Sequence, residues 1–147
     1  MITDYLLALA CAVFAILTLR SPSPHAAVPI WFLAFLTGSI AAFLGGTFHG
    51  FKLHFTAGRA KGLWDFTMIL IGASAAFMIA GAIVSSVGRG DLESVKWIRR
   101  GLIVSALGFV VQKIGWDLHQ HFNHNDIYHV IQIFGFWFLY EGVRRLE

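Results

Sequence analysis

Cysteine and charged residues are scarce in this chain of 147 residues. The one cysteine, Cys11, excludes an intrachain disulfide and a metal site built from several thiolates. Only 13% of the residues are charged, whereas 57% are hydrophobic, a composition typical of an integral membrane protein. The formal net charge of +3 is better explained by an excess of basic residues in some of the loops than by a nucleic-acid surface.

Apolar stretches long enough to cross a bilayer recur along the sequence. A helix needs about 17 to 25 mostly apolar residues to cross the roughly 30 Å hydrocarbon core of a membrane. We therefore predict an all-α fold in a single domain, an integral membrane bundle of about five transmembrane helices. The predicted spans cover about residues 3–19, 28–49, 64–87, 100–116 and 126–143.

The first apolar stretch contains Asp4 and no Lys or Arg before residue 20. A secretory signal peptide normally begins with positive charge, so we expect this stretch to remain as the first helix. Cytoplasmic loops carry the excess of Lys and Arg in membrane proteins. With the N-terminus outside, the inner side holds Arg20, Arg89, Lys96, Arg99, Arg100, Arg144 and Arg145, and the outer side holds Lys52, Arg59, Lys61 and Lys113. The predicted topology is therefore multi-pass, with the N-terminus out and the C-terminus in.

Histidine is concentrated near the predicted helix ends. Six histidines lie around the connection between the second and third spans or the connection between the fourth and fifth, namely His49, His54, His119, His121, His124 and His129. Alternation of five spans brings both connections to the same face of the membrane. Asp65 and Asp126, at the starts of the third and fifth spans, belong to that face as well. We therefore expect a polar cluster at one membrane boundary.

Such a cluster has two interpretations. Imidazole is the commonest protein ligand of metals, and a catalytic zinc has three protein ligands and one open position for water. Interfacial His and Asp residues can also solvate loop backbone or cap helices. Asn123 and Asp126 are the candidates for capping the last helix. The residues alone leave both interpretations open.

Three short motifs resemble those of the alkaline ceramidase-like membrane hydrolases, whose superfamily also contains the adiponectin receptors and the GPI-lipid remodelling proteins. "GGTFHG" ends the second span, "LWDFTMI" opens the third and "NDIYH" opens the last. In that family a Ser followed four positions later by a His ends one helix, an Asp begins the next, and a His-x-x-x-His pair lies on the last. The three histidines hold zinc, and the enzymes cleave amide or ester bonds of membrane lipids. The resemblance implies zinc ligation by His49 and His129, with Asp65 as the acidic residue.

Two positions depart from the family pattern. Gly45 stands where the family has its Ser, and Thr47 is the nearest candidate for a replacement hydroxyl. Asn125 stands where the first histidine of the last pair belongs, four residues before His129 and so on the same helix face. His124 can substitute only if the last helix begins later than predicted. The other candidates for a third ligand are His54 and Asp65. The family usually has seven spans, so the resemblance covers only the motif helices.

The sequence therefore predicts a zinc-dependent membrane hydrolase that cleaves an amide or ester bond of a lipid such as ceramide. The predicted metal ligands are His49, His129 and His124, and the predicted catalytic residues are Asp65, Thr47 and Asn125. With the N-terminus outside, this site lies on the extracytoplasmic side. The alternative is a non-enzymatic subunit of a larger membrane complex, in which histidines could hold haem or another pigment. Small residues in the spans would also allow the chain to pair with a second copy.

Overall fold

Five long α-helices account for most of the described chain in the computed structural model, which describes all residues except 1, 88–91, 120–121 and 147. The helices are α1 (Ile2–Leu19), α2 (Ala27–Phe51), α3 (Ala57–Val87), α4 (Leu92–Ile114) and α5 (His124–Val143), and the short 3-10 helix η1 (Lys52–His54) follows α2. The all-α prediction is confirmed.

Helix boundaries differ from the predicted spans at α3 and α4. Helix α3 begins at Ala57 and helix α4 at Leu92, whereas the predicted spans begin near residues 64 and 100. The first turns of both helices contain charged residues. These residues are helical, but they are not apolar, so a prediction based on apolar stretches places the helix starts too late. Helix α4 also ends at Ile114, before the predicted residue 116.

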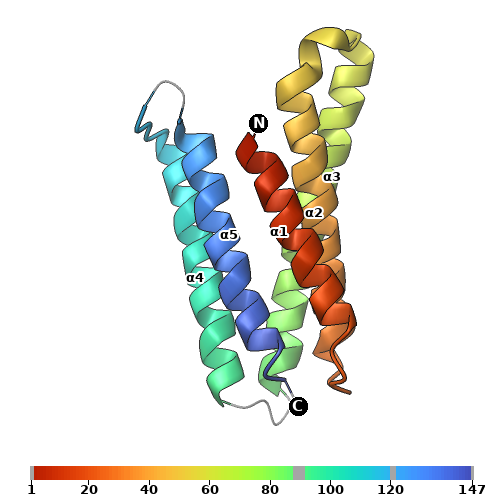
Figure 1. Cartoon of the computed structure of the whole chain (residues 1–147), viewed down its shortest axis with the longest axis vertical. Helices are drawn as coiled ribbons and strands as arrows, with labels where there is room; N and C mark the ends of the chain where they lie inside the picture. The colour runs from red at the N-terminus through yellow and green to blue at the C-terminus, as the bar shows by residue number, and fades with distance from the viewer. Residues whose placement is uncertain (1, 88–91, 120–121, 147) are drawn as a thin grey trace.

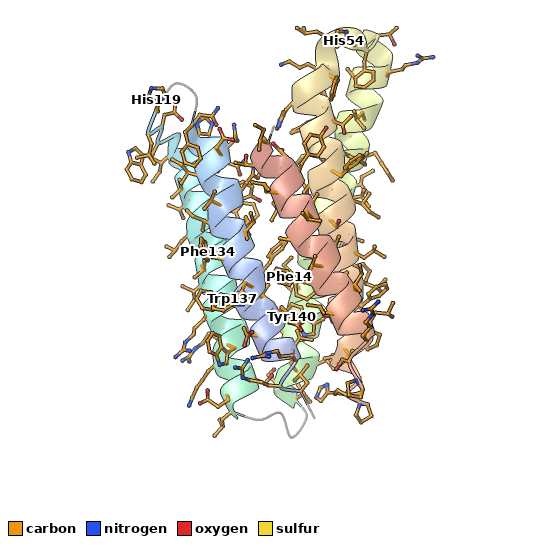
Figure 2. All side chains as sticks on the ribbon, in the orientation of Figure 1. Phe14, His54, His119, Phe134, Trp137 and Tyr140 are labelled. Carbon is orange, nitrogen blue, oxygen red and sulfur yellow. The ribbon has the colours of Figure 1, made fainter. Side chains whose placement is uncertain are left out.

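Consecutive helices run in opposite directions, as Figure 1 shows. Helix α2 packs against α1 and α3, helix α4 pairs with α5, and contacts between α1 and α5 join the two groups. The starts of α1, α3 and α5 therefore lie at the same end as the ends of α2 and α4. We call this the histidine end, because His49 and His124 lie in terminal helical turns there and Figure 2 shows His54 and His119 there. The opposite end is called the arginine end, because Arg20, Arg144 and Arg145 lie there and Arg99 and Arg100 lie in the first half of α4.

Small residues allow α4 and α5 to approach closely. A Cβ atom added to Gly101 would lie 2.6 Å from Leu139 Cγ and 2.8 Å from the carbonyl oxygen of Gly135. Position 101 therefore has no room for a larger residue. Nearby, Ser94 Oγ donates a hydrogen bond of 2.8 Å to the carbonyl of Gly142. Close approach through small residues and hydroxyl groups is typical of helix pairs in membranes.

Apolar side chains lie both in the core and on the outer surface. Trp31, Phe35 and Leu139 are fully buried, and Trp31 Nε1 donates to Ser85 Oγ at 3.1 Å. Many large apolar residues on the outer faces are exposed, among them Ile69 at 66% and Ile83 at 56%. Within the described residues, α1, the segment Ala27–His54 and α3 are long and apolar enough to cross a membrane. This agrees with an integral membrane protein.

Candidate functional site

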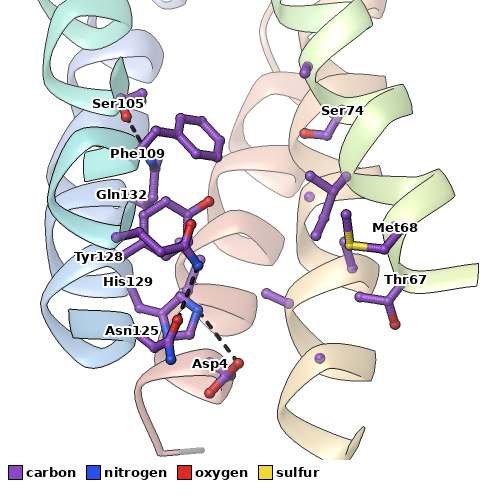
Figure 3. Close-up of a pocket in the computed structure, with 18 of the residues that line it drawn as sticks. Asp4, Thr67, Met68, Ser74, Ser105, Phe109, Asn125, Tyr128, His129 and Gln132 are labelled. Atoms are coloured by element: carbon purple, nitrogen blue, oxygen red, sulfur yellow. Dashed lines mark hydrogen bonds and ion pairs between the residues drawn. The ribbon is translucent and has the colours of Figure 1, made fainter. Parts of the chain in front are cut away.

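A cavity of about 320 Å³ runs from the histidine end toward the middle of the bundle, and all five helices contribute to its wall. Figure 3 shows its two facing sides, with Met68 and Ser74 of α3 on one side and Phe109, Tyr128 and Gln132 of α4 and α5 on the other. Most of the wall is apolar. The polar side chains are concentrated on α4 and α5 and around Asp4 of α1.

Helical spacing explains which side chains face the cavity. On α5, the lining positions Asn125, Tyr128, His129, Gln132 and Phe136 recur at intervals of three or four residues and so occupy one helix face. The same spacing on α3 selects the positions 64, 67, 68, 71, 74, 75 and 78. A single stripe of α5 thus begins with an amide and an imidazole and ends with an aromatic ring.

Asp4 lies at the centre of the polar end of the cavity. Its Oδ1 atom is 3.4 Å from His49 Nδ1 and 3.6 Å from His129 Nε2. The Asp4 side chain is only 3% exposed, that of His129 is 10% exposed and that of His49 is 38% exposed. A buried carboxylate needs partners of this kind, because an unpaired charge away from water is costly.

A second set of contacts fixes the orientation of these groups. Thr3 Oγ1 donates a hydrogen bond of 2.6 Å to Asp126 Oδ1 and lies 3.1 Å from His129 Nδ1. Both ring nitrogens of His129 therefore have close partners. Gln112 Nε2 donates to Asn125 Oδ1 at 3.1 Å, which ties α4 to α5 beside the same cavity. Such outer contacts hold the side chains of a site in one orientation.

Three of the residues predicted for the site come together. His49, Asn125 and His129 all line the cavity, as expected from the alternation of the helices. Asp65 does not line it: its Oδ2 atom lies 2.5 Å from Lys61 Nζ on the outer face of α3, and its side chain is 52% exposed. The stripe of α3 that faces the cavity includes the neighbouring Trp64 but leaves Asp65 outside.

The predicted third ligand, His124, does not line the cavity either. Helix α5 begins at His124, directly after the N-cap Asn123, so the later start that would turn His124 inward does not occur. His124 Nδ1 lies 2.8 Å from Asp117 Oδ1, and the backbone N–H of His124 donates to the same oxygen at 2.6 Å. These two contacts with His124 lower the pKa of Asp117 below its ordinary value, with the backbone hydrogen bond contributing most.

Thr47 and His54 also lie outside the cavity lining. Thr47 Oγ1 donates to the carbonyl of Phe43 at 2.9 Å and lies 3.3 Å from the Tyr5 hydroxyl. His54 is exposed in η1, where α2 and α3 extend past the other helices (Figure 1). His121, part of the predicted histidine cluster, lies outside the described residues.

Asp4 is the residue that the sequence interpretation missed as part of the site. A carboxylate inside an apolar helix by itself indicates a functional site, because placing an ionisable group within a membrane costs free energy. Gly46 of α2 makes room for Asp4, and Gly45 lies beside its carboxylate. A Cβ atom added to Gly46 would lie 2.9 Å from Asp4 Cβ, and one added to Gly45 would lie 3.6 Å from Asp4 Oδ1. The Asp4 carboxylate therefore lies beside the position at which the ceramidase-like pattern has its Ser.

The arrangement can move protons. A carboxylate beside one nitrogen of an imidazole fixes the ring and its tautomer, so that the other nitrogen can accept a proton. His49 has this geometry, because Nδ1 faces Asp4 and Nε2 has no hydrogen-bond partner within the described part of the chain. In the same part of the chain, no group of three or more His, Cys, Asp and Glu residues has an arrangement that could hold a metal ion. Asp4, His49 and His129 are donor types that zinc accepts, but within the described residues they are not arranged as a metal site.

Comparison with known protein families identifies the family of this chain. Residues 1–95 and residues 85–147 match the sequence model of a family of unknown function, DUF6962. Neither the curated proteins nor the solved structures include a match to this chain. The resemblance to the ceramidase-like hydrolases therefore stays a prediction. Because the two matched segments together extend over the whole sequence, the chain belongs to the DUF6962 family.

Proposed function

We propose that this protein is an integral membrane hydrolase that cleaves an amide or ester bond of an amphipathic lipid such as ceramide. The observation that carries the proposal is the cluster of Asp4, His49 and His129 at the polar end of an otherwise apolar cavity. A cavity of about 320 Å³ is within the size range of small-molecule sites, which are mostly apolar and contain a few polar groups. The acyl chain would lie along the apolar wall, with the carbonyl group beside His49.

All five helices cross the membrane in this proposal. Helices α4 and α5 contain 23 and 20 residues, and about 20 helical residues extend roughly 30 Å. Both helices expose large apolar side chains, such as Leu107 at 56% and Phe134 at 56%. The concentration of arginine at one end favours a cytoplasmic arginine end and an extracytoplasmic site.

The residues of the cluster would divide the work as follows. His49 Nε2 takes a proton from water, the water oxygen attacks the carbonyl carbon, and the same proton passes to the departing nitrogen or oxygen as the bond breaks. Asp4 orients His49 and stabilises its positive charge. His129, held by Thr3 and Asp4, keeps the carboxylate in place. Aspartate and histidine are thus positioned for one proton to be taken up and returned within a single turnover.

Zinc is an alternative to His49 as the group that activates the water, because an imidazole bound to zinc cannot also take up the proton. Its ligands would be His49, His129 and Asp4, two imidazoles and a carboxylate, which is a donor set that catalytic zinc sites use, once these side chains moved from the present arrangement, which is not a metal site. When bound, zinc would supply a hydroxide at neutral pH and polarise the carbonyl group. Asp4 replaces His124 as the third proposed ligand because Asp4 lines the cavity and His124 does not.

The test is hydrolysis of ceramide-like and lysolipid substrates by the purified protein in mixed micelles, with and without added zinc. We expect His129→Ala to abolish hydrolysis while the protein stays folded, because Asp4 then loses one of its two imidazole partners. No hydrolysis of any tested lipid by a folded, monodisperse wild-type protein would contradict the proposal and favour the non-enzymatic membrane subunit. A Soret absorbance band in the purified protein would instead support haem binding.

A further inference from the structure

A second cavity lies at the arginine end, between the end of α1, the loop that follows it and the end of α5. Its volume is about 470 Å³, and Arg20, Arg144 and Arg145 all contribute to its wall. The hydroxyl-bearing residues Ser21 and Tyr140 line it as well. The Asp4 cluster lies at the opposite end of α1, so neither cavity depends on the other.

Positive charge is in excess in this cavity. Among the described residues, Glu141 forms ion pairs with two of these arginines: its Oε2 atom lies 2.9 Å from Arg144 Nη2 and 2.6 Å from Arg145 Nη1. Glu93 of α4 also interacts electrostatically with Arg145. Arg20 has no acidic partner among the residues that the structure describes. Among the described residues, three guanidinium groups in the cavity wall and the two carboxylates of Glu141 and Glu93 leave a net positive charge, which a bound anion would balance.

The arginine side chains that follow α5, Arg144 and Arg145, are held in place before any ligand arrives. Arg145 Nη1 also donates to the backbone carbonyl of Glu141, and the guanidinium carbon of Arg145 lies 4.9 Å from the centre of the Trp97 ring. The Tyr140 ring stacks on Phe14 with a centroid distance of 5.3 Å, where α1 and α5 meet in Figure 2. A preorganised site loses little side-chain entropy on binding.

We propose that this cavity binds a phosphate group, supplied by the headgroup of an anionic phospholipid or by free phosphate. The planar guanidinium group matches the oxygens of phosphate in pairs, and hydroxyl groups can complete the set of donors. Leu17, which is 40% exposed, lies in the wall of the cavity, and Val13, four positions earlier on the same helix face, is also exposed. These side chains give an acyl chain an apolar path beside the phosphate. Basic pockets between helices at a membrane boundary bind anionic headgroups in this way.

The experiment compares lipid retention by native mass spectrometry of the detergent-solubilised protein. Arg20→Gln removes the arginine that has no acidic partner, and Arg99→Gln removes an equal charge from an exposed position of α4 at the same end, outside the cavity. We expect the wild type and Arg99→Gln to retain one phosphatidylglycerol per chain at least tenfold more tightly than phosphatidylcholine. Arg20→Gln should lose this preference while its melting temperature stays near that of the wild type.

A second arm distinguishes the two sources of phosphate. Inorganic phosphate is titrated into protein held in neutral detergent without phospholipid. Saturable binding that Arg20→Gln weakens, without any preference for phosphatidylglycerol, would assign the cavity to free phosphate. Equal retention of both phospholipids together with no phosphate binding would overturn the proposal. An equal loss in Arg20→Gln and Arg99→Gln would also overturn it, because the effect would then come from general surface charge.

Discussion

Asp4 Oδ1 lies 3.4 Å from His49 Nδ1, which joins the first turn of α1 to the last turns of α2. The contact places a negative charge against an imidazole at the boundary between the apolar cavity and the histidine end. His129 of α5 approaches the same oxygen, so three helices meet at one carboxylate.

Asp4→Asn keeps the size of the side chain and removes its charge. We expect hydrolysis to fall by about 10²- to 10⁴-fold, the usual contribution of general acid–base groups, because His49 loses the carboxylate that orients it. The measurement is the rate of lipid hydrolysis per folded protein in mixed micelles. Asp65→Asn is the matched control, since Asp65 is exposed and pairs with Lys61. Retained activity in Asp4→Asn would exclude a catalytic role for the cluster.

Chelation tests the zinc part of the proposal. A metal that bridges α1, α2 and α5 lends its binding free energy to the folded state, so EDTA should lower the melting temperature in detergent. His49→Ala should remove this sensitivity, whereas His124→Ala should keep it, because His124 contacts Asp117 outside the cavity. Unchanged melting with EDTA, together with no metal by elemental analysis, would show that the site works without zinc or not at all.

Gly46→Ala should disturb the approach of α1 to α2. The added Cβ would lie 2.9 Å from Asp4 Cβ and 3.3 Å from the Tyr5 ring, and overpacking of this kind usually costs about 1–3 kcal/mol. Gly45→Ala is the adjacent control, because its Cβ would be in ordinary contact at 3.6 Å from Asp4 Oδ1. Thermal unfolding in detergent compares the two variants. Equal melting temperatures of the two variants would mean that α1 can move to accommodate the added methyl group without a loss of stability.

Asn123→Ala should remove the cap of α5. The Asn123 side chain accepts the backbone N–H groups of Asn125 at 2.9 Å and Asp126 at 3.4 Å, and Asp126 Oδ2 accepts the backbone N–H of Asn123 at 3.3 Å. Loss of such a cap costs about 1 kcal/mol. Asn123→Ser retains a capping oxygen and should recover most of the stability in a denaturation measurement. Hydrolysis per folded molecule should not change in either variant.

The contact between Asp117 and His124 should make the start of α5 sensitive to acid. The pKa of Asp117 is lowered in the folded chain, so this contact stabilises the fold fully above the ordinary aspartate value, about 4, and is lost as the pH falls through the lowered pKa. The chemical shift of the His124 backbone amide in detergent micelles should therefore change with a midpoint below about pH 4. Asp117→Asn should abolish the transition. A midpoint above the ordinary value would contradict this account.

Local sequence patterns determined the helices and the cap. Apolar stretches of sufficient length gave five helices, because helix formation and membrane burial depend on neighbouring residues. Alternation of these helices predicted that His49, Asn125 and His129 would meet, and all three line the cavity. Asn123 was a capping candidate because of its place before a helical pattern, and the capping box that it forms with Asp126 confirms this.

Only the tertiary structure decided which charged groups belong to the site. Asp65 and His124 have the expected positions in sequence, but the rotation of α3 and the start of α5 at His124 leave both outside the cavity. Asp4 enters the site because α1 packs against both α2 and α5. The contact of α1 with α5 includes that between Thr3 and His129, which are 126 residues apart in the sequence. Sequence patterns report on neighbours along the chain. The rotation of each helix about its axis instead depends on packing, here on Gly46 of α2, which leaves room for Asp4 of α1.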